Sequence, residues 1–309
     1  MKAPAVDETS EGRNRARLAI IELANMISVP MSLNAVVKLR VADAIWGGGA
    51  NSPLTAAEII SRVIPNNPSA DADNLHRLLR LLSSYGVFAE HSSGGCPRYS
   101  LTEIGMTLVA DAEGLSYGDY VLQHHQKALV KAWPLVDRAV VGALPFEVAN
   151  GEPAYSYYGK DEEMNALMQH AMAGVSVPVM KAILDGGYDG FAGGEVARLV
   201  DVGGSAGDCL RMIMNKYKNI KEGINFDLPE VVAKAPQIPG VSMDTPPMVI
   251  NPPLRGMKLS ACCPPLSLLA SADEDVDVPE MSSSIHPNPF LLVATFTNRN
   301  MIEIIFLYD

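Results

Sequence analysis

Five small residues between two apolar runs form the segment of this sequence best suited to holding a ligand. The segment 203–207 (GGSAG) follows the β-branched run 198–202 and precedes a stretch with apolar residues at helical spacing. A second apolar run, 223–226, ends at Asp227, which lies 20 residues after Gly207. A strand, a glycine-rich turn, a helix, a second strand and an acid, in this order, predict the first unit of a nucleotide-binding α/β sheet.

The glycines and the acid have chemistry that suits a nucleoside cofactor. Gly203, Gly204 and Gly207 let the chain turn sharply and let the backbone approach a ligand closely, and the helix behind them offers free amide groups. An acid at the offset of Asp227 reaches ribose hydroxyls, because a carboxylate accepts hydrogen bonds from two neighbouring hydroxyls. These four residues are the predicted cofactor-binding residues.

This motif has three interpretations: a dinucleotide site, an S-adenosylmethionine site and a turn that binds no ligand. Dinucleotides prefer G-x-G-x-x-G, because their pyrophosphate lies at the helix start, but here Ser205 replaces the second glycine and Asp208 stands in place of the third. A negative side chain at 208 would be unfavourable beside a pyrophosphate. The pattern Asp201-x-Gly203-x-x-x-Gly207 fits S-adenosylmethionine better, because this cofactor carries no phosphate. We therefore expect S-adenosylmethionine, with an α/β turn that binds nothing as the alternative.

The first 115 residues predict helices followed by a β-hairpin, which is the order of a winged helix. A capping box at 55–58 opens one helix, and leucines at 75, 78, 79 and 82 share one face of the next. Gly86 ends that helix, and the runs 87–90 and 98–101 flank a turn. The segment holds 10 Lys and Arg against 12 Asp and Glu. Because a DNA-binding module is basic, we expect a packing or dimerisation domain.

Composition places the chain among globular proteins. It has 309 residues, 48% of them hydrophobic, and a net charge of -11, which opposes nucleic-acid binding. The four cysteines lack zinc-type spacing, and no run reaches the roughly 18 apolar residues of a membrane span. We expect a soluble cytoplasmic protein without a metal site, with segments 1–115, 116–190, 191–241 and 242–309 as its parts.

Several stretches resemble the plant caffeic acid O-methyltransferase class of S-adenosylmethionine-dependent methyltransferases. LVDVGGSAGDCL and GINFDLPEVVAKAPQIPGV resemble the cofactor-binding half of that family, and RARLAIIELANMISVPMSLNAVVKLRVADAIW resembles its dimerisation domain. The resemblance spans about residues 11–241, and ELANMISVPMSLNA and SYGDYVLQHHQKAL are most similar to members that methylate nicotinate. It implies an α/β fold, with an N-terminal helical winged-helix dimerisation domain before a truncated Rossmann-like methyltransferase domain. It also implies a homodimer and an aromatic acceptor, either nicotinate or a phenolic acid.

The resemblance also implies site residues. Ser176 and Met180 align with positions beside the methyl donor, Ser176 toward the cofactor and Met180 toward the acceptor. His124 stands at a substrate-contacting position, and Tyr120 lies four residues earlier on the same helix face, so both could donate hydrogen bonds to an acceptor carboxylate. Asn25 could supply a third donor from the partner subunit. The alternatives are a core methionine and a histidine that has only a structural role.

The resemblance ends near Val241, and the catalytic residue stays unknown because the family segment that carries the base is absent. The tail 242–309 holds 9 of the 22 prolines and predicts loops or disorder, with two apolar runs at 290–296 and 301–308 that could form strands. If neither pairs with the first strand, that strand has an exposed edge. We therefore expect weak or no methyltransferase activity. The rival functions are O-methylation of a phenol and a non-catalytic dimerisation partner.

Overall fold

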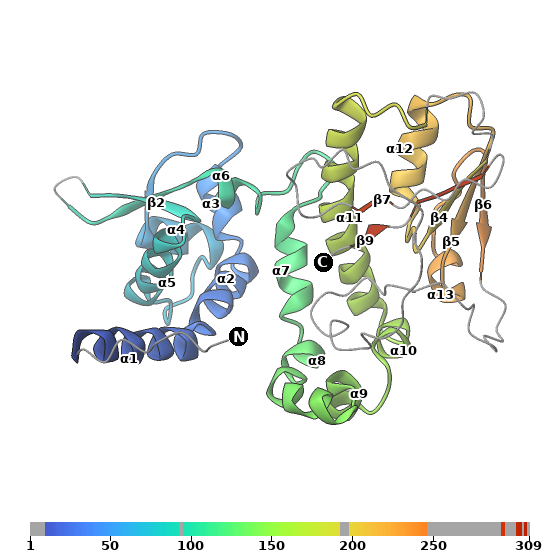
Figure 1. Cartoon of the computed structure of the whole chain (residues 1–309). Coiled ribbons are helices and arrows are strands. Elements are labelled where there is room, and N and C mark those ends of the chain that lie inside the picture. The colour runs from blue at the N-terminus through green and yellow to red at the C-terminus, as the bar shows by residue number, and fades with distance from the viewer. Residues whose placement is uncertain are drawn as a thin grey trace. The chain divides into compact units, whose positions relative to one another are not determined.

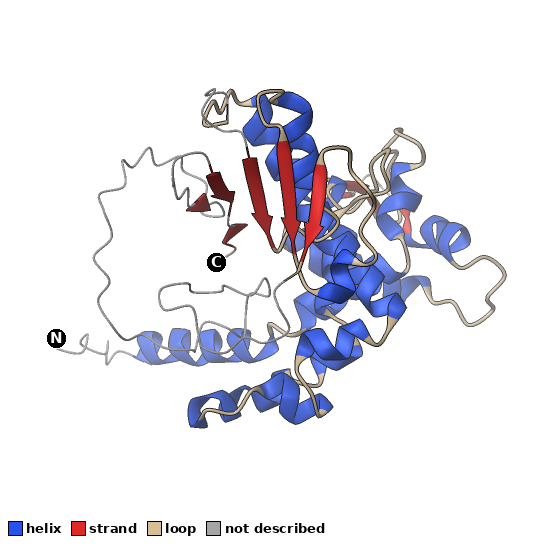
Figure 2. Cartoon of the chain, turned by 90° about the vertical axis from the view of Figure 1, so that its right-hand side faces the viewer, coloured by secondary structure: helices blue, strands red, loops and turns tan. Residues whose placement is uncertain are grey.

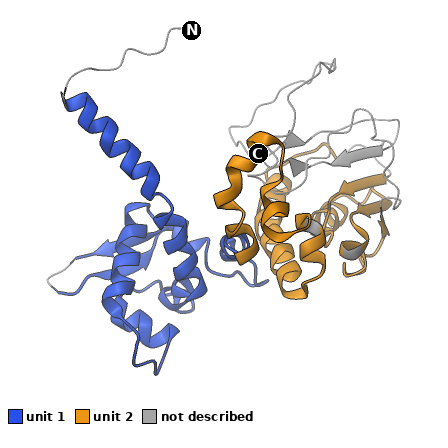
Figure 3. Ribbon diagram, turned by 90° about the horizontal axis from the view of Figure 1, so that it is seen from below, with its two compact units in different colours: residues 1–126 blue, residues 127–309 orange. Residues whose placement is uncertain are grey.

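The structure is a computed structural model of the chain (Figure 1). It describes residues 10–92, 95–191, 198–245, 292–293, 301–304 and 306–307, and for those after 245 only the backbone. The chain divides into two compact units, Met1–Gln126 and Lys127–Asp309, coloured separately in Figure 3. Each unit has a buried hydrophobic core of its own.

Unit 1 is helical with one small antiparallel sheet. Its sheet has the order β1-β3-β2, in which β3 pairs with both neighbours. This is the predicted hairpin joined by a third, two-residue strand. The elements of unit 1 are α1 (Ser10–Asn25), α2 (Ser28–Lys38), α3 (Val41–Trp46), β1 (Leu54–Thr55), α4 (Ala56–Val63), α5 (Ala72–Ser84), β2 (Phe88–His91), β3 (Arg98–Leu101), α6 (Glu103–Met106) and α7 (Tyr117–His124).

Local sequence signals account for several helix ends in unit 1. Thr55 caps α4 in the predicted capping box, in which the Thr55 hydroxyl accepts from the Glu58 amide and the Glu58 carboxylate accepts from the Thr55 amide. Gly86, with φ of 75°, follows the end of α5 as predicted. The apolar N-terminal stretch is interrupted at 26–27, between α1 and α2, and Pro30 lies in the first turn of α2. Proline is tolerated there because the first-turn amides have no partner within the helix.

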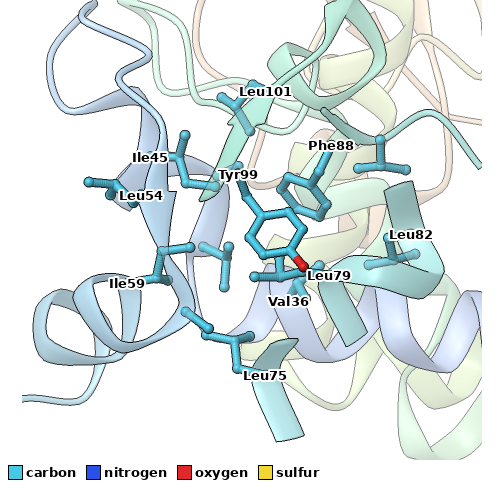
Figure 4. Close-up of a cluster of buried hydrophobic side chains, with 14 residues drawn as sticks. Val36, Ile45, Leu54, Ile59, Leu75, Leu79, Leu82, Phe88, Tyr99 and Leu101 are labelled. Carbon is cyan, nitrogen blue, oxygen red and sulfur yellow. The ribbon is translucent and has the colours of Figure 1, made fainter. Parts of the chain in front are cut away.

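The core of unit 1 forms where α5 and the hairpin meet (Figure 4). Tyr99 of β3 is fully buried among Phe88, Leu79 and Ile59. Its hydroxyl is 2.7 Å from Nδ1 of His76, so the buried polar atom is satisfied. The predicted leucine face of α5 is thus the face that packs inward.

Unit 2 begins with short helices and ends in a parallel sheet. The Gly-rich run after α11 predicts a domain boundary, whereas the two compact units divide at 126/127. The elements of unit 2 are α8 (Lys127–Val130), η1 (Trp133–Val141), α9 (Pro145–Asn150), α10 (Ala154–Gly159), α11 (Glu162–Asp185), β4 (Arg198–Val202), α12 (Asp208–Lys216), β5 (Glu222–Phe226), α13 (Pro229–Val232), β6 (Val241–Asp244), β7 (Leu292–Val293), β8 (Met301–Ile304) and β9 (Phe306–Leu307).

The sheet of unit 2 has the order β6-β5-β4-β8, and every pairing in it is parallel (Figure 2). Strands β4 and β5 are the predicted pair. Strand β6, aligned with β5 from Val241↔Gly223 to Asp244↔Phe226, begins at the residue near which the family resemblance ends. Strand β8 of the tail pairs with β4 from Met301↔Arg198 to Ile304↔Asp201. The edge of β4 is therefore covered. Besides β8, the structure describes residues 242–245, 292–293 and 306–307 of the tail.

Helices α11 and α12 share a buried core with β4 in unit 2. Met180 and Leu184 of α11 pack with Leu199, Leu210 and Ile213. By length and composition alone, the stretches Glu11–Lys38 and Glu162–Asp185 are long and apolar enough to cross a membrane. Part of the apolar surface of α11 is buried against α12. The expectation of a soluble protein stays a prediction.

Candidate functional site

The glycine-rich segment forms a loop that connects the end of β4 to α12 and is held by the end of β5. The amide of Ser205 donates to Oδ2 of Asp227 at 2.8 Å, and its carbonyl accepts from Nδ2 of Asn225 at 2.9 Å. Ser205 has a φ of 51°, in the left-handed region that non-glycine residues rarely occupy. Two side chains of the neighbouring strand thus fix a strained backbone position, as occurs in ligand-binding loops.

The glycines of the loop are required by space and by conformation. Gly203 and Gly207 have φ of 75° and 80°. A Cβ on Gly204 would collide with Oδ1 of Asn225 and lie 2.7 Å from the Asp201 carboxyl. A Cβ on Gly203 would meet no atom within 4 Å, so this side of the loop is open to a ligand.

Asp227 has the position and the spare capacity of a hydroxyl acceptor. It is half-buried, and its carboxylate accepts from the amides of Ser205 and Leu228 at 2.8 and 2.7 Å. Each carboxylate oxygen keeps a further acceptor site. No side chain caps α12, so its first amides also remain available as donors. The loop, the open side at Gly203 and Asp227 fit the nucleoside and amino-acid parts of S-adenosylmethionine.

Two carboxyls with different environments lie under the loop. Asp201, on β4, is 2% exposed, and burial raises its pKa to about 7, with the charge of Asp227 adding to the rise. Oδ1 of Asp201 and Oδ1 of Asn225 are buried, and neither has a hydrogen-bond partner among the described residues. The pattern Asp201-x-Gly203-x-x-x-Gly207 places Asp201 in the predicted cofactor motif, whereas no sequence pattern singles out Asn225.

Ser176 and Met180 lie in unit 2, near the start of α12. The Ser176 hydroxyl donates to the carbonyl of Met172 at 2.9 Å and hydrogen-bonds the Cys209 thiol. Burial raises the pKa of Cys209 to about 12, so this thiol is protonated at neutral pH. Met180 is 2% exposed and packs in the core of unit 2. Ser176 is therefore next to the helix that follows the glycine loop, and Met180 is a core residue in this structure.

Tyr120 and His124 of α7 lie together in unit 1, as their spacing predicts. Their ring centroids are 3.9 Å apart, and Nδ1 of His124 lies 2.9 Å from the Tyr120 carbonyl. A carbonyl only accepts, so Nδ1 carries the proton. Burial lowers the pKa of His124. The neutral ring therefore presents Nε2 as an acceptor, and Nε2 donates only when the ring is protonated.

Asn25 is the exposed last residue of α1. The apolar side chains before it on α1 are also exposed, with Leu23 62% and Ile20 63% accessible. No three His, Cys, Asp or Glu side chains come together as a metal site within the described residues.

Two family models match the chain. The O-methyltransferase dimerisation domain matches residues 21–111, and the O-methyltransferase domain matches residues 133–247. Nicotinate N-methyltransferase 1 of Arabidopsis thaliana is 66% identical over 242 residues, which cover 76% of this chain and 67% of that protein. The chain belongs to the O-methyltransferase family.

Other relatives place the chain within this family. Nicotinate N-methyltransferase 1 of Glycine max is 67% identical over 76% of this chain and 66% of its own length. Caffeic acid 3-O-methyltransferase of Catharanthus roseus is 37% identical over 73% of this chain and 62% of its own length. This O-methyltransferase family chain spans about two thirds of the length of the relatives it matches.

A solved structure supports the fold of this O-methyltransferase family chain. Human N-acetylserotonin methyltransferase, in complex with SAM, has a TM-score of 0.61 and is 20% identical over 79% of this chain and 68% of that one. At this identity the likeness concerns the fold alone. The expected architecture, a dimerisation domain before an α/β methyltransferase domain, is confirmed, and so is membership of the resembled family.

Proposed function

We propose that this protein binds S-adenosylmethionine and nicotinate as a nicotinate N-methyltransferase whose own turnover is weak or absent. The observation that carries the proposal is identity of 66% and 67% to two nicotinate N-methyltransferases, against 37% to a caffeic acid 3-O-methyltransferase. The glycine loop supports the choice of cofactor, because an open turn and a hydroxyl-accepting carboxylate occur together at the end of the sheet.

We assign cofactor binding to Gly203, Gly204, Gly207 and Asp227, with Ser176 in support beside α12. When bound, S-adenosylmethionine supplies a methyl group on a positively charged sulfur. The backbone at Gly203 allows close approach, and Asp227 orients the ribose through its free acceptor sites. The glycine loop thereby holds the cofactor in a fixed position.

We assign recognition of the acceptor carboxylate to Tyr120 and His124, with Asn25 of the partner subunit as a third donor, and leave out Met180, which is buried in the core of unit 2. The chain need not remove a proton from a pyridine nitrogen, whose lone pair is available at neutral pH. It has only to orient the ring. Phenolic oxygen would require a base, and no base is assigned in this chain.

Binding and turnover together test the proposal. Calorimetry with S-adenosylhomocysteine is expected to give micromolar affinity for the full chain. In its presence, saturation-transfer NMR is expected to detect bound nicotinate and not caffeate. Binding of caffeate without nicotinate would replace the proposal with a phenolic O-methyltransferase. Turnover of nicotinate is followed by mass spectrometry in parallel, and weak or no turnover is expected of this chain.

The second candidate is a non-catalytic dimerisation partner of a longer subunit. It is favoured by the exposed apolar residues of α1 within the match to the dimerisation domain. Co-purification with a full-length relative, together with no binding of S-adenosylhomocysteine by the folded chain, would support this candidate over the enzyme. We propose a homodimer in the cytoplasm as the state of the protein when it is expressed alone.

A further inference from the structure

The amide of Asn225 has one fixed orientation below the glycine loop. The side chain is fully buried, and its Nδ2 donates to the carbonyl of Ser205 at 2.9 Å. Because a carbonyl only accepts, the amide cannot be turned over without losing this bond. Oδ1 of Asn225 consequently points away from Ser205 and lacks a donor among the described residues.

The Asp201 carboxyl lies on the other side of the same glycine. Asp201 and Asn225 are directly paired in the register of β4 and β5, and a Cβ added to Gly204 would run into both side chains. Within the described residues, Oδ1 of Asp201 also lacks a partner. Two buried acceptors with no donor are costly, and a proton on the Asp201 carboxyl would supply a donor.

No described positive charge compensates an ionised Asp201. The titratable groups that act on it from neighbouring elements are the Asp227 carboxylate at the end of β5 and the Cys209 thiol on α12. Asp227 opposes a second negative charge, and the buried thiol stays protonated. An unpaired carboxylate in this position would carry the full cost of burial.

We propose that Asp201 is a neutral carboxylic acid in this protein and donates its hydroxyl proton to Oδ1 of Asn225. This bond completes a line of donors in one direction, from Asp201 to Asn225, from Asn225 to the Ser205 carbonyl, and from the Ser205 amide to Asp227. Asp201 is thereby a positioning residue for the loop and for Asp227.

The proton makes the loop sensitive to pH. When Asp201 loses this proton, its carboxylate faces the Asn225 oxygen and the Asp227 charge. The hydrogen bonds that hold Ser205 are then weakened. Affinity for the cofactor then falls as pH rises, by up to about tenfold per pH unit above the midpoint of the Asp201 titration. This consequence rests on the proposed function, whereas the protonation state does not.

The protonation state is measured by carbon-13 NMR of the full chain with labelled aspartate carboxyls. The Asp201 resonance is assigned by its loss in Asp201→Asn, and exposed Asp185 is assigned in the same way as the control. At about pH 6, Asp201 is expected to be protonated. Ionisation of Asp201 at that pH would overturn the proposal.

The positioning role is measured by calorimetry with S-adenosylhomocysteine between about pH 6 and pH 8. The unchanged chain and Asp185→Asn are expected to lose affinity as pH rises. Asp201→Asn is expected to bind equally well across the range, because its amide donates to Asn225 without titrating. The same pH slope in Asp201→Asn would overturn the role. If calorimetry showed no binding of S-adenosylhomocysteine at any pH while NMR showed a protonated Asp201, the result would count against the proposed function and not against the protonation state.

Discussion

At the scale of single residues, the protonation state of the His124 imidazole makes affinity for the acceptor depend on pH. Its Nδ1 donates to the Tyr120 carbonyl, so Nε2 donates to an acceptor carboxylate only from the protonated ring. Burial lowers the pKa of His124 from its ordinary value. The donating form therefore dominates only below that lowered pKa. We predict that affinity for nicotinate, measured by NMR titration, falls as pH rises from about 5.5 to 7.5.

A matched variant separates this effect from general changes of the protein with pH. Gln in place of His124 keeps a donor that does not titrate, so His124→Gln is expected to bind nicotinate with no pH dependence in this range. The control His170→Gln changes an exposed histidine of α11 and is expected to behave as the unchanged chain. If His124→Gln retained the slope, recognition by this imidazole would be wrong.

The buried carboxyl of Asp201 also makes local stability depend on pH. Its pKa is raised to about 7 in the folded chain from an ordinary value of 3.8, so the folded state binds the proton more tightly. The contribution of Asp201 to the free energy of unfolding is fully present below about pH 4. It falls as pH rises, by up to about 4 kcal/mol once pH passes 7. Asp201→Asn is expected to remove this loss.

Hydrogen exchange of peptides that cover β4 and β5 measures the Asp201 effect without requiring two-state unfolding of the whole chain. The unchanged chain should exchange faster at pH 8 than at pH 6 after correction for the intrinsic rate. Asp201→Asn should show a smaller difference, and Asp185→Asn should match the unchanged chain. Equal differences in all three would show that Asp201 is not the group responsible.

At the scale of elements, the conformation of the glycine loop requires that Gly204 carry no side chain. Gly204 has no positive φ, and a Cβ there meets the Asn225 amide and the Asp201 carboxyl. We predict that Gly204→Ala displaces Ser205 and weakens binding of S-adenosylhomocysteine by at least about tenfold in calorimetry, because the loop must move to relieve the overlap. Gly95→Ala, in open space of the unit 1 hairpin, should bind normally. Normal binding by Gly204→Ala would mean that the loop does not form the cofactor site.

The elements that sequence patterns predicted are those whose signals are local. The run at 198–202 and the acid at Asp227 identified β4 and the end of β5, and the capping box identified α4. Strand β6 was missed because its four residues, VSMD, are too few for their alternation of apolar and polar side chains to stand out. The pairing of Asp201 with Asn225 was missed because it arises from register between strands, which no local pattern records.

At the scale of the whole molecule, the tail contributes a strand to the sheet of unit 2. Strand β8 covers the edge of β4 from Arg198 to Asp201, and an uncovered edge promotes association between chains. We predict that Ile302→Pro, which places a proline inside β8, lowers the temperature at which light scattering detects aggregation. Val293→Pro alters β7, which belongs to a separate two-stranded sheet, and should have a smaller effect. Equal effects would show that pairing with β4 is not what protects the chain.

The proposed homodimer depends on α1, whose apolar side chains are not covered by the described residues of the chain. Ile20 and Leu23 lie three residues apart on α1, and each is more than half exposed. Exposed apolar residues gathered on one element are typical of an interface. We predict that the unchanged chain sediments as a dimer and that Leu23→Asp shifts it toward monomer, because a charge placed in an apolar interface loses its hydration. Val140→Asp is the matched control, since Val140 is 83% exposed but lies on η1 of unit 2. A dimer that survived Leu23→Asp and dissociated with Val140→Asp would move the interface from α1 to η1.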